Sequence, residues 1–416
     1  MSSNTPKQSS LLSLNKFKQC MRCAAFGDVI GFEHEFDKST QSITKRFDSL
    51  APDVSFNPSK LKMVSDDTVM HLATARALLR KDVFVVDHST KCFKFDDALF
   101  IETIREEYIE CLSLDSMNGR AAGIQCLNAV QPMSEEVFPK YSATAGGNGA
   151  TMRSMCIGLL LPHKWQMRLM VRASVISAAV THNNATAILG AVMAATFTSL
   201  AIKLGSKFVS IWPQLFFGKY FYSDPWEDGF YQSIKDGTWN PSETSSPFEL
   251  TFYYCREIGI TGDWSWQEDH VHYFRRMWLD YQIRGPAPAR IESESQWDSF
   301  WVSMSFSGWQ GSSGHDAPMM AFDGLCDVIL KRGPSTKSDP YTEMKHSEWR
   351  RLMRMTACHG GDSDSTATNA AAWYGVMFDK VDAECYQQFL TVEFSDEITS
   401  VSTRLFQLAL KLEQPL

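Results

Sequence analysis

The longest apolar stretch of the chain, residues 185–202, sets the strongest limit on how the chain can fold. It contains several Thr and Ser residues and follows the polar run His182-Asn183-Asn184, so it would span a membrane poorly. An apolar segment of this kind must otherwise be covered by protein. We therefore expect a buried helix here and no membrane among the partners of the protein.

Several other segments carry apolar residues at helical spacing and are rich in Ala, Leu and Met. They are residues 67–79, 97–112, 152–161 and 366–376. Alternation typical of strands is scarce and brief, as in residues 83–86. We therefore expect an all-α fold, a compact helical bundle, in preference to a layered α/β sheet.

Domain organisation follows from where the composition changes. With 416 residues, 44% hydrophobic and 21% charged, the chain is an ordinary globular one. Residues 1–16 are polar and are expected to form a flexible extension, so that one domain spans residues 17–416 with insertions at about 205–250 and 333–345. The aromatic-rich segment 208–247 is interpreted as an inserted loop or lid, part of which packs on the body.

Charge and cysteine content exclude several classes of partner and compartment. The chain has 40 basic and 48 acidic residues and no long basic run, which argues against nucleic acid as a partner. Its 10 cysteines are scattered, and the Cys20–Cys23 pair lacks a second half-site for zinc. We expect free thiols in a cytoplasmic protein, since the N-terminal apolar patch is too short for a signal peptide.

Two short acidic motifs each open a helix. The first is Ser65-Asp66-Asp67-Thr68, whose residue types also serve as ordinary helix caps. The second is His359-Gly360-Gly361-Asp362-Ser363-Asp364-Ser365-Thr366, which precedes an Ala-rich helix. If the two helix starts face each other, their carboxylates and hydroxyls form a set of hard oxygen donors. Such a set favours two Mg²⁺ ions, with Mn²⁺ as the alternative.

Two glycine-rich segments add groups suited to a nucleotide. Residues 145–153 form a turn that feeds a helix, where exposed backbone N–H groups favour phosphate. Residues 306–316 combine an aromatic start with flexible glycines and several hydroxyls, which suit a base and a sugar.

Taken together, these residues resemble the ADP-ribosylglycohydrolase family, and most closely its eukaryotic ADP-ribosyl-arginine hydrolases. The resemblance implies an all-α orthogonal bundle with a dinuclear Mg²⁺ site and hydrolysis of the N-glycosidic bond between ADP-ribose and arginine. The matching blocks run in order through most of the chain: residues 27–31, 64–75, 118–121, 146–159, 181–182, 305–319 and 359–366.

The resemblance also implies roles for single residues. The metal ligands of the family fall on Ser65, Asp66, Asp67, Asp362, Asp364 and Ser365. Glu35 matches a glutamate near the scissile ribose, although Glu33 is a competing alignment and a solvated surface glutamate is the alternative interpretation. Among the carboxylates, Asp66, Asp67 and Glu35 are the candidates for accepting a proton from the attacking water.

Substrate contacts are implied in the same way. Gly147, Asn148 and Gly149 would hold the diphosphate, His182 would lie near the ribose, and Phe306 would pack on the adenine. A lone histidine is also often structural. The run from Gly308 to His315, which favours arginine over serine linkage, and the preceding Ser307 contribute further candidate substrate-binding residues: Ser307, Gly308, Ser313, Gly314 and His315.

The sequence departs from the family pattern at two sites. Asn183 and Asn184 follow His182 where relatives usually have Pro, and Phe306 stands where Tyr is common. The expectation is nevertheless a cytoplasmic, monomeric hydrolase that acts on ADP-ribosylated proteins and binds ADP-ribose. The alternatives are a hydrolase of O-linked ADP-ribose, on serine or acetate, and a catalytically silent ADP-ribose-binding relative.

Overall fold

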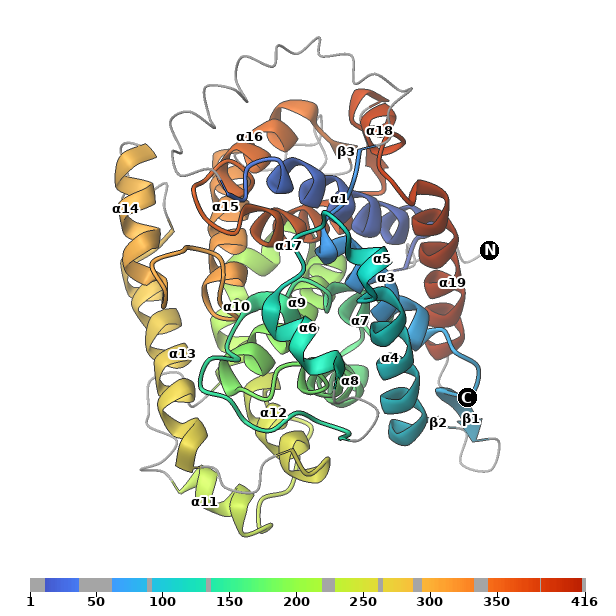
Figure 1. Ribbon diagram of the computed structural model, residues 1–416, viewed down its shortest axis with the longest axis vertical. Coiled ribbons are helices and arrows are strands. Elements are labelled where there is room, and N and C mark those ends of the chain that lie inside the picture. The colour runs from blue at the N-terminus through green and yellow to red at the C-terminus, as the bar shows by residue number, and fades with distance from the viewer. Residues whose placement is uncertain are drawn as a thin grey trace, which may run out of the picture.

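A computed structural model describes residues 12–36, 62–87, 92–131, 136–218, 229–260, 265–286, 294–332, 343–381 and 383–413. Within these ranges the chain is mainly helical, which confirms the expected all-α class (Figure 1). The short strands form one antiparallel pair, β1 (Phe84–Asp87) with β2 (Cys92–Phe95), and one parallel pair, β3 (Glu343–Met344) with β4 (Lys380–Val381).

The helices are distributed along the whole chain. The first half contains α1 (Leu14–Phe32), α3 (Asp66–Leu78), α4 (Asp97–Cys111), α5 (Leu114–Met117), α6 (Ile124–Val130), α7 (Met155–Leu160), α8 (Met167–Ala179) and α9 (Ala185–Leu204). The second half contains α10 (Phe208–Phe216), α11 (Phe230–Lys235), α12 (Pro247–Glu257), α13 (Ser265–Arg284), α14 (Glu294–Met304), α15 (Asp316–Arg332), α16 (His346–Thr356), α17 (Ser363–Val376), α18 (Ala383–Phe389) and α19 (Ser395–Glu413). Short 3₁₀ turns lie at Asn148–Ala150, Lys164–Gln166 and Gly205–Lys207.

The five expected helices are found, with small shifts at their ends. They correspond to α3, α4, α7, α9 and α17, and the expected strand at residues 83–86 corresponds to β1. Helix α7 begins at Met155, three residues later than expected, because the preceding residues form the glycine-rich turn and a 3₁₀ segment.

Helix α9 is the buried helix expected from its apolar sequence. All of its residues from Ala185 to Ile202 are buried, and its hydroxyls bond to backbone oxygens, as Thr196 does to Val192 at 2.7 Å. By length and composition residues 185–216 could cross a membrane, but the whole apolar window is buried inside the protein. Packing within the bundle therefore accounts for its hydropathy.

Helices α1 and α17 pack unusually closely, because glycines of α1 face the backbone of α17. A Cβ atom on Gly27 would lie 2.7 Å from the Ala367 oxygen, and one on Gly31 would lie 2.4 Å from the Ser363 oxygen. The Ser363 hydroxyl also donates to the Gly31 oxygen at 2.8 Å. This contact fixes the beginning of α17 against the end of α1.

The aromatic segment differs from the loop or lid expected for residues 208–247. Its described part contains α10 and α11, and Phe208, Trp212 and Phe230 are buried. The Trp212 ring lies 5.9 Å from Phe197 of α9 and 4.9 Å from Trp278 of α13. The aromatics are thus part of the core, which confirms that part of the segment packs on the body, whereas the irregular composition hid the short helices α10 and α11. Residues 219–228 lie outside the described part of the chain.

The expected N-terminal extension and the expected insertion at 333–345 lie mostly outside the described part of the chain. Residues 1–11 and 333–342 are not among the described residues. Helix α1 already begins at Leu14 and Leu12 is buried, so order starts earlier than the expected boundary at Phe17. All eight cysteines whose side chains are described, including Cys20 and Cys23, are buried thiols.

We predict that Gly31→Ala lowers the free energy of unfolding by about 1–3 kcal/mol or more, because the added methyl overlaps the α17 backbone. Gly123→Ala is the matched control, since a Cβ there meets no atom within 4 Å. Urea denaturation of both variants checks this. Equal stability of the two would contradict the close packing.

Acid should destabilise the protein partly through His71. This ring is buried, accepts a hydrogen bond from the Cys156 N–H at 3.1 Å, and burial lowers its pKa from 6.5 to about 3. The folded form therefore binds fewer protons below pH 6.5, and stability is lost as pH falls through that window. Between pH 7 and pH 5 the wild type should lose about 2 kcal/mol more than His71→Gln, which retains an acceptor without titrating. Denaturation at both pH values measures the difference, and parallel losses would refute it.

Candidate active site

The start of α3 is held by a buried carboxylate from α1. Asp28 accepts hydrogen bonds from the backbone N–H groups of Ser65 and Thr68, each at 3.1 Å, and from the Thr68 hydroxyl. The Ser65 hydroxyl accepts from the Asp67 N–H at 3.1 Å, so it caps the helix. Because these two groups satisfy the helix start, the carboxylates of Asp66 and Asp67 remain available for other partners.

A second clamp holds the residues just before α3. Arg120 pairs with Glu393 at 2.7 Å and donates to the Val64 oxygen at 2.6 Å. The Asp66 N–H donates to the Arg120 oxygen at 3.2 Å. The hydrogen bond from Arg120 also lowers the pKa of Glu393, which keeps this pair charged. The start of α3 is therefore fixed from two sides.

The beginning of α17 faces the beginning of α3. The Asp362 N–H donates to the Gln310 oxygen at 2.8 Å, and Gly361 leaves no room for a side chain at this contact. The Ser365 hydroxyl then donates to Asp67 Oδ1 at 3.2 Å and links the two helix starts directly. The two acidic motifs, separated by most of the sequence, thus form one cluster.

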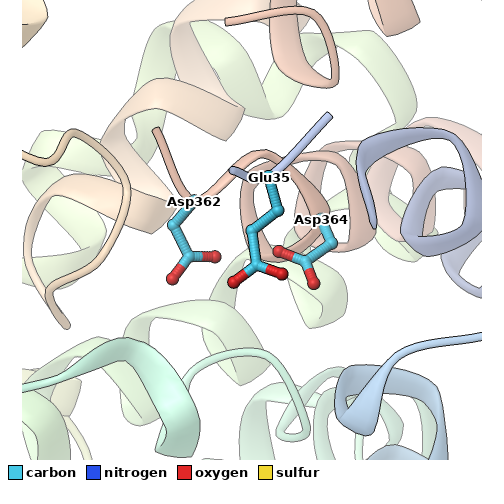
Figure 2. A group of neighbouring side chains, drawn as sticks. All are labelled: Glu35, Asp362 and Asp364. Atoms are coloured by element: carbon cyan, nitrogen blue, oxygen red, sulfur yellow. The ribbon is translucent and has the colours of Figure 1, made fainter. Parts of the chain in front are cut away.

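Glu35 joins this cluster from the end of α1. Its carboxylate and those of Asp362 and Asp364 offer oxygens within 4.8 Å of one another, and Figure 2 shows all three pointing toward the same space. Glu35 is buried, with only 6% of the residue exposed. The competing residue Glu33 has a side chain 54% exposed and pairs with Lys62 at 3.6 Å, so the structure brings Glu35 and not Glu33 to the site.

Burial and mutual repulsion disfavour the ionised forms of these carboxyl groups. Burial, with Asp364 and Asp66 nearby, raises the pKa of Glu35 to about 9, and burial raises that of Asp362 to about 7. Burial, followed by repulsion from Asp364, holds the pKa of both Asp66 and Asp67 well above its usual value. A bound cation would reverse this repulsion.

The donor set fits such a cation. Within the described residues, Glu35 Oε2 and Asp67 Oδ2 are buried and lack hydrogen-bond partners. Unsatisfied buried carboxylate oxygens are costly unless something positive binds them. The donors are all oxygens, which is the ligand type that small divalent ions prefer.

Two cavities meet at the glycine-rich turn. The acidic cavity, of about 200 Å³, is lined by the carboxylates together with His182 and Trp309. The aromatic cavity, of about 270 Å³, is lined by Phe306, Tyr273 and His315, among others. Both cavities share Gly147 and Ser312, where Gly147 pairs with Ser313 in a short antiparallel bridge. A ligand could therefore extend from one cavity into the other.

The aromatic cavity offers a surface for a flat ring. Phe306 is 67% exposed, and its ring lies 5.7 Å from Tyr273 in an edge-to-face arrangement. Tyr273 also lies 4.8 Å from His315, whose Nε2 bonds to the Met304 oxygen at 2.9 Å. Tyr273 and His270 come from α13, where no motif marked them in the sequence.

Some residues expected at the substrate also make structural contacts. Gly314 is packed so closely on α9 that a Cβ would lie 2.5 Å from the Thr186 oxygen, and neither Gly314 nor Gly308 lines either cavity. The Asn148 N–H donates to the Ser312 oxygen at 3.1 Å, and its side chain donates to Gly311 at 2.6 Å. Asn148 thus holds the turn in place, although it lines the acidic cavity.

The remaining expected residues line the cavities. Gly147, Gly149 and His182 lie at the acidic cavity, and Ser307, Ser313 and His315 lie at the aromatic one. Asp28 and Arg120 are supporting residues that were not singled out for a role. The available signal for Asp28 was an acidic residue within the otherwise apolar second half of α1, residues 23–32.

Comparison with known proteins agrees with this geometry. The family model described as ADP-ribosylglycohydrolase matches residues 9–414. The chain belongs to the ADP-ribosylglycohydrolase family. Among curated relatives of this family, it is 28% identical over 398 residues to ADP-ribosylhydrolase ARH1 of Dictyostelium discoideum, with 89% of each chain covered. A solved structure titled ADP-ribosylglycohydrolase-related protein complex superposes with a TM-score of 0.50 at 12% identity, covering 95% of this chain and 98% of that one. This likeness supports the fold.

We predict that Asp364→Asn raises the melting temperature of the metal-free hydrolase, because it removes one of the mutually repelling carboxylates. If the cluster binds Mg²⁺, the ion should raise the melting temperature of wild type further, and the same change should abolish that rise. Thermal unfolding with EDTA and with Mg²⁺ measures both effects. The exposed Asp115→Asn serves as the control and should behave as wild type. A metal-free Asp364→Asn protein less stable than wild type would argue against a repulsive cluster.

Proposed function

We propose that this ADP-ribosylglycohydrolase family member hydrolyses the N-glycosidic bond between ADP-ribose and arginine of mono-ADP-ribosylated proteins. The observation that carries the proposal is the junction of the acidic and aromatic cavities at Gly147 and Ser312. ADP-ribose has a base at one end and a reactive ribose at the other. Its adenine would stack on Phe306, and its distal ribose would reach the carboxylates.

The acidic cluster would hold two Mg²⁺ ions, with Mn²⁺ as a substitute, through Asp66, Asp67, Asp362 and Asp364 together with Ser65 and Ser365. Bound ions of this kind supply positive charge that orients ribose hydroxyls and makes a water more acidic. Ser65 would be a weaker metal ligand than the carboxylates, because its hydroxyl oxygen already accepts a hydrogen bond from the Asp67 N–H.

The carboxylates of the chain would act on the glycosidic bond itself. Cleavage passes through an oxocarbenium-like state, which nearby negative charge stabilises. A carboxylate must also accept a proton from the attacking water. We favour Glu35 over Asp67 for this step, because Glu35 lies outside the proposed set of metal ligands, whereas Asp67 belongs to that set and also accepts a hydrogen bond from the Ser365 hydroxyl.

An aromatic face beside the acidic cavity favours arginine as the linked residue. Trp309 lines this cavity, and its ring stacks on that of Phe36 at 6.4 Å with 25° between the planes. A planar guanidinium stacks well on an indole, whereas the oxygen of a serine linkage gains nothing from it. Phe36 directly follows Glu35, so this stack also lies next to the proposed proton acceptor.

We expect release of ADP-ribose from arginine-modified protein in the presence of Mg²⁺. EDTA or Asp364→Ala should abolish it, because either one dismantles the cation site. The assay measures free ADP-ribose over time for arginine-linked and serine-linked substrates side by side. Trp309→Leu should slow the arginine-linked reaction by about tenfold in kcat/KM, the size of a cation–π contact at a partly buried site, and change the serine-linked reaction less.

The two alternatives give different results in the same assay. Faster release from the serine-linked substrate or from O-acetyl-ADP-ribose would assign the enzyme to O-linked ADP-ribose. Tight ADP-ribose binding without release from any substrate would identify a silent binder. We further propose a cytoplasmic setting, which is compatible with the free thiols of the described cysteines.

A further inference from the structure

Arg153 is a buried cation that has no carboxylate partner among the described residues. It is 0% exposed, and its guanidinium contacts the Ser177 oxygen at 2.7 Å, the Thr181 hydroxyl at 2.6 Å and the Cys126 sulfur at 3.8 Å. The guanidinium also contacts the Met70 sulfur at 3.9 Å and lies over the face of Tyr108, 4.5 Å from the ring centre. Burying a charge without a counter-ion costs free energy of folding, so this arginine destabilises the protein when no anion is bound nearby.

The hydrogen bonds around Thr181 fix the direction of each proton. A guanidinium only donates, so the Thr181 oxygen must accept from Arg153. The Thr181 hydroxyl proton is then free to donate, and the nearest acceptor is His182 Nδ1 at 2.7 Å, much closer than the Ala178 oxygen at 3.5 Å. Nδ1 of His182 is therefore the accepting nitrogen.

It follows that a neutral His182 carries its proton on Nε2. Burial, assisted by the charge of Arg153, lowers the pKa of His182 to about 3, which keeps the ring neutral. Nε2 faces the glycine-rich turn: a Cβ on Gly149 would lie 3.2 Å from it, and one on Gly147 would lie 3.8 Å from it. His182 also lines the acidic cavity, where the turn separates it from the aromatic cavity.

We propose that Arg153 and Thr181 form a relay that locks His182 as the Nε2–H tautomer, so that this N–H donates to the diphosphate of a bound ADP-ribose. The relay rests on the proposed binding of ADP-ribose, but not on which linkage is cleaved. Arg153 and Thr181 are positioning residues, since they act on the ligand through His182.

The buried charge of Arg153 gains a second use in this arrangement. Cys126 contacts Arg153 and also lines the acidic cavity, so it connects the guanidinium with the wall of that cavity. An anionic diphosphate at the turn would face this cation across a medium of low polarity, where attraction is weakly screened. The ligand thus supplies the counter-charge that the described residues lack.

The test acts on Thr181, because truncating the buried arginine endangers folding. The hydroxyl is removed in Thr181→Val, which keeps a similar shape, and is retained in Thr181→Ser. Two-bond proton–nitrogen spectra of histidine-labelled full-length protein report the tautomer of each histidine, and His182→Gln assigns the signal. The expected result is the Nε2–H form in wild type and Thr181→Ser, and loss of that form in Thr181→Val.

Calorimetry with ADP-ribose and with adenosine supplies the second readout. Thr181→Val should weaken ADP-ribose by about tenfold, the cost of one hydrogen bond to a charged group, and leave adenosine unchanged. Thr181→Ser should restore wild-type affinity. A wild-type Nδ1–H tautomer, unchanged ADP-ribose binding in Thr181→Val, or equal weakening of both ligands would overturn the relay.

The spectra and the binding data also separate this inference from the proposed function. If Thr181→Val does not fold, the tautomer in wild type and in Thr181→Ser still decides the matter. Failure of the arginine-linked assay with an intact relay would overturn only the assigned linkage. A wild type that binds no ADP-ribose would overturn both.

Discussion

The hydrogen bonds between Asp28 and the start of α3 determine where the acidic cluster forms. Asp28 lies between Gly27 and Gly31, the two residues that let α1 approach α17. One short stretch of α1 therefore contacts both α3 and α17, the helices from which the clustered aspartates come. Because Glu35 follows at the end of the same helix, α1 sets the relative positions of all these groups. A change in this stretch would move every member of the cluster together.

The fold holds several carboxylates close together, and their mutual repulsion lowers the stability of the protein. Asp66, Asp67, Asp362 and Asp364 are buried near one another, and each has a raised pKa. Backbone clamps from Asp28 and Arg120 prevent the helix starts from separating to relieve the repulsion. Sites that bind charged ligands tightly are often built this way, because the free energy lost in the empty protein is recovered on binding. Arg153 is the corresponding case for a positive charge: it is buried without a carboxylate partner among the described residues, and an anionic ligand would compensate it.

The sequence predicted those parts of the site that depend on local patterns. The motifs at Ser65 and His359 indicated helix starts, because capping residues act over a few positions. Tyr273 gave no signal, because it reaches the aromatic cavity only through the packing of a long polar helix. Gly314 shows a related limit: glycine serves ligand approach and helix packing equally well, and the sequence does not reveal how closely this residue packs on Thr186. Trp212 was assigned to a loop because dense aromatics mask helical periodicity.

The pairing of α1 with α17 also affects how the chain must be made. Its two partners stand near opposite ends of the sequence, with the apolar α9 between them. During synthesis α9 emerges long before α17, whose Trp373 donates to the Ala194 oxygen of α9 at 3.3 Å. Contacts between such distant segments form slowly, and exposed apolar segments tend to associate with other chains meanwhile. We therefore expect the apolar surface of α9 to need protection from association with other chains until α17 has been synthesised.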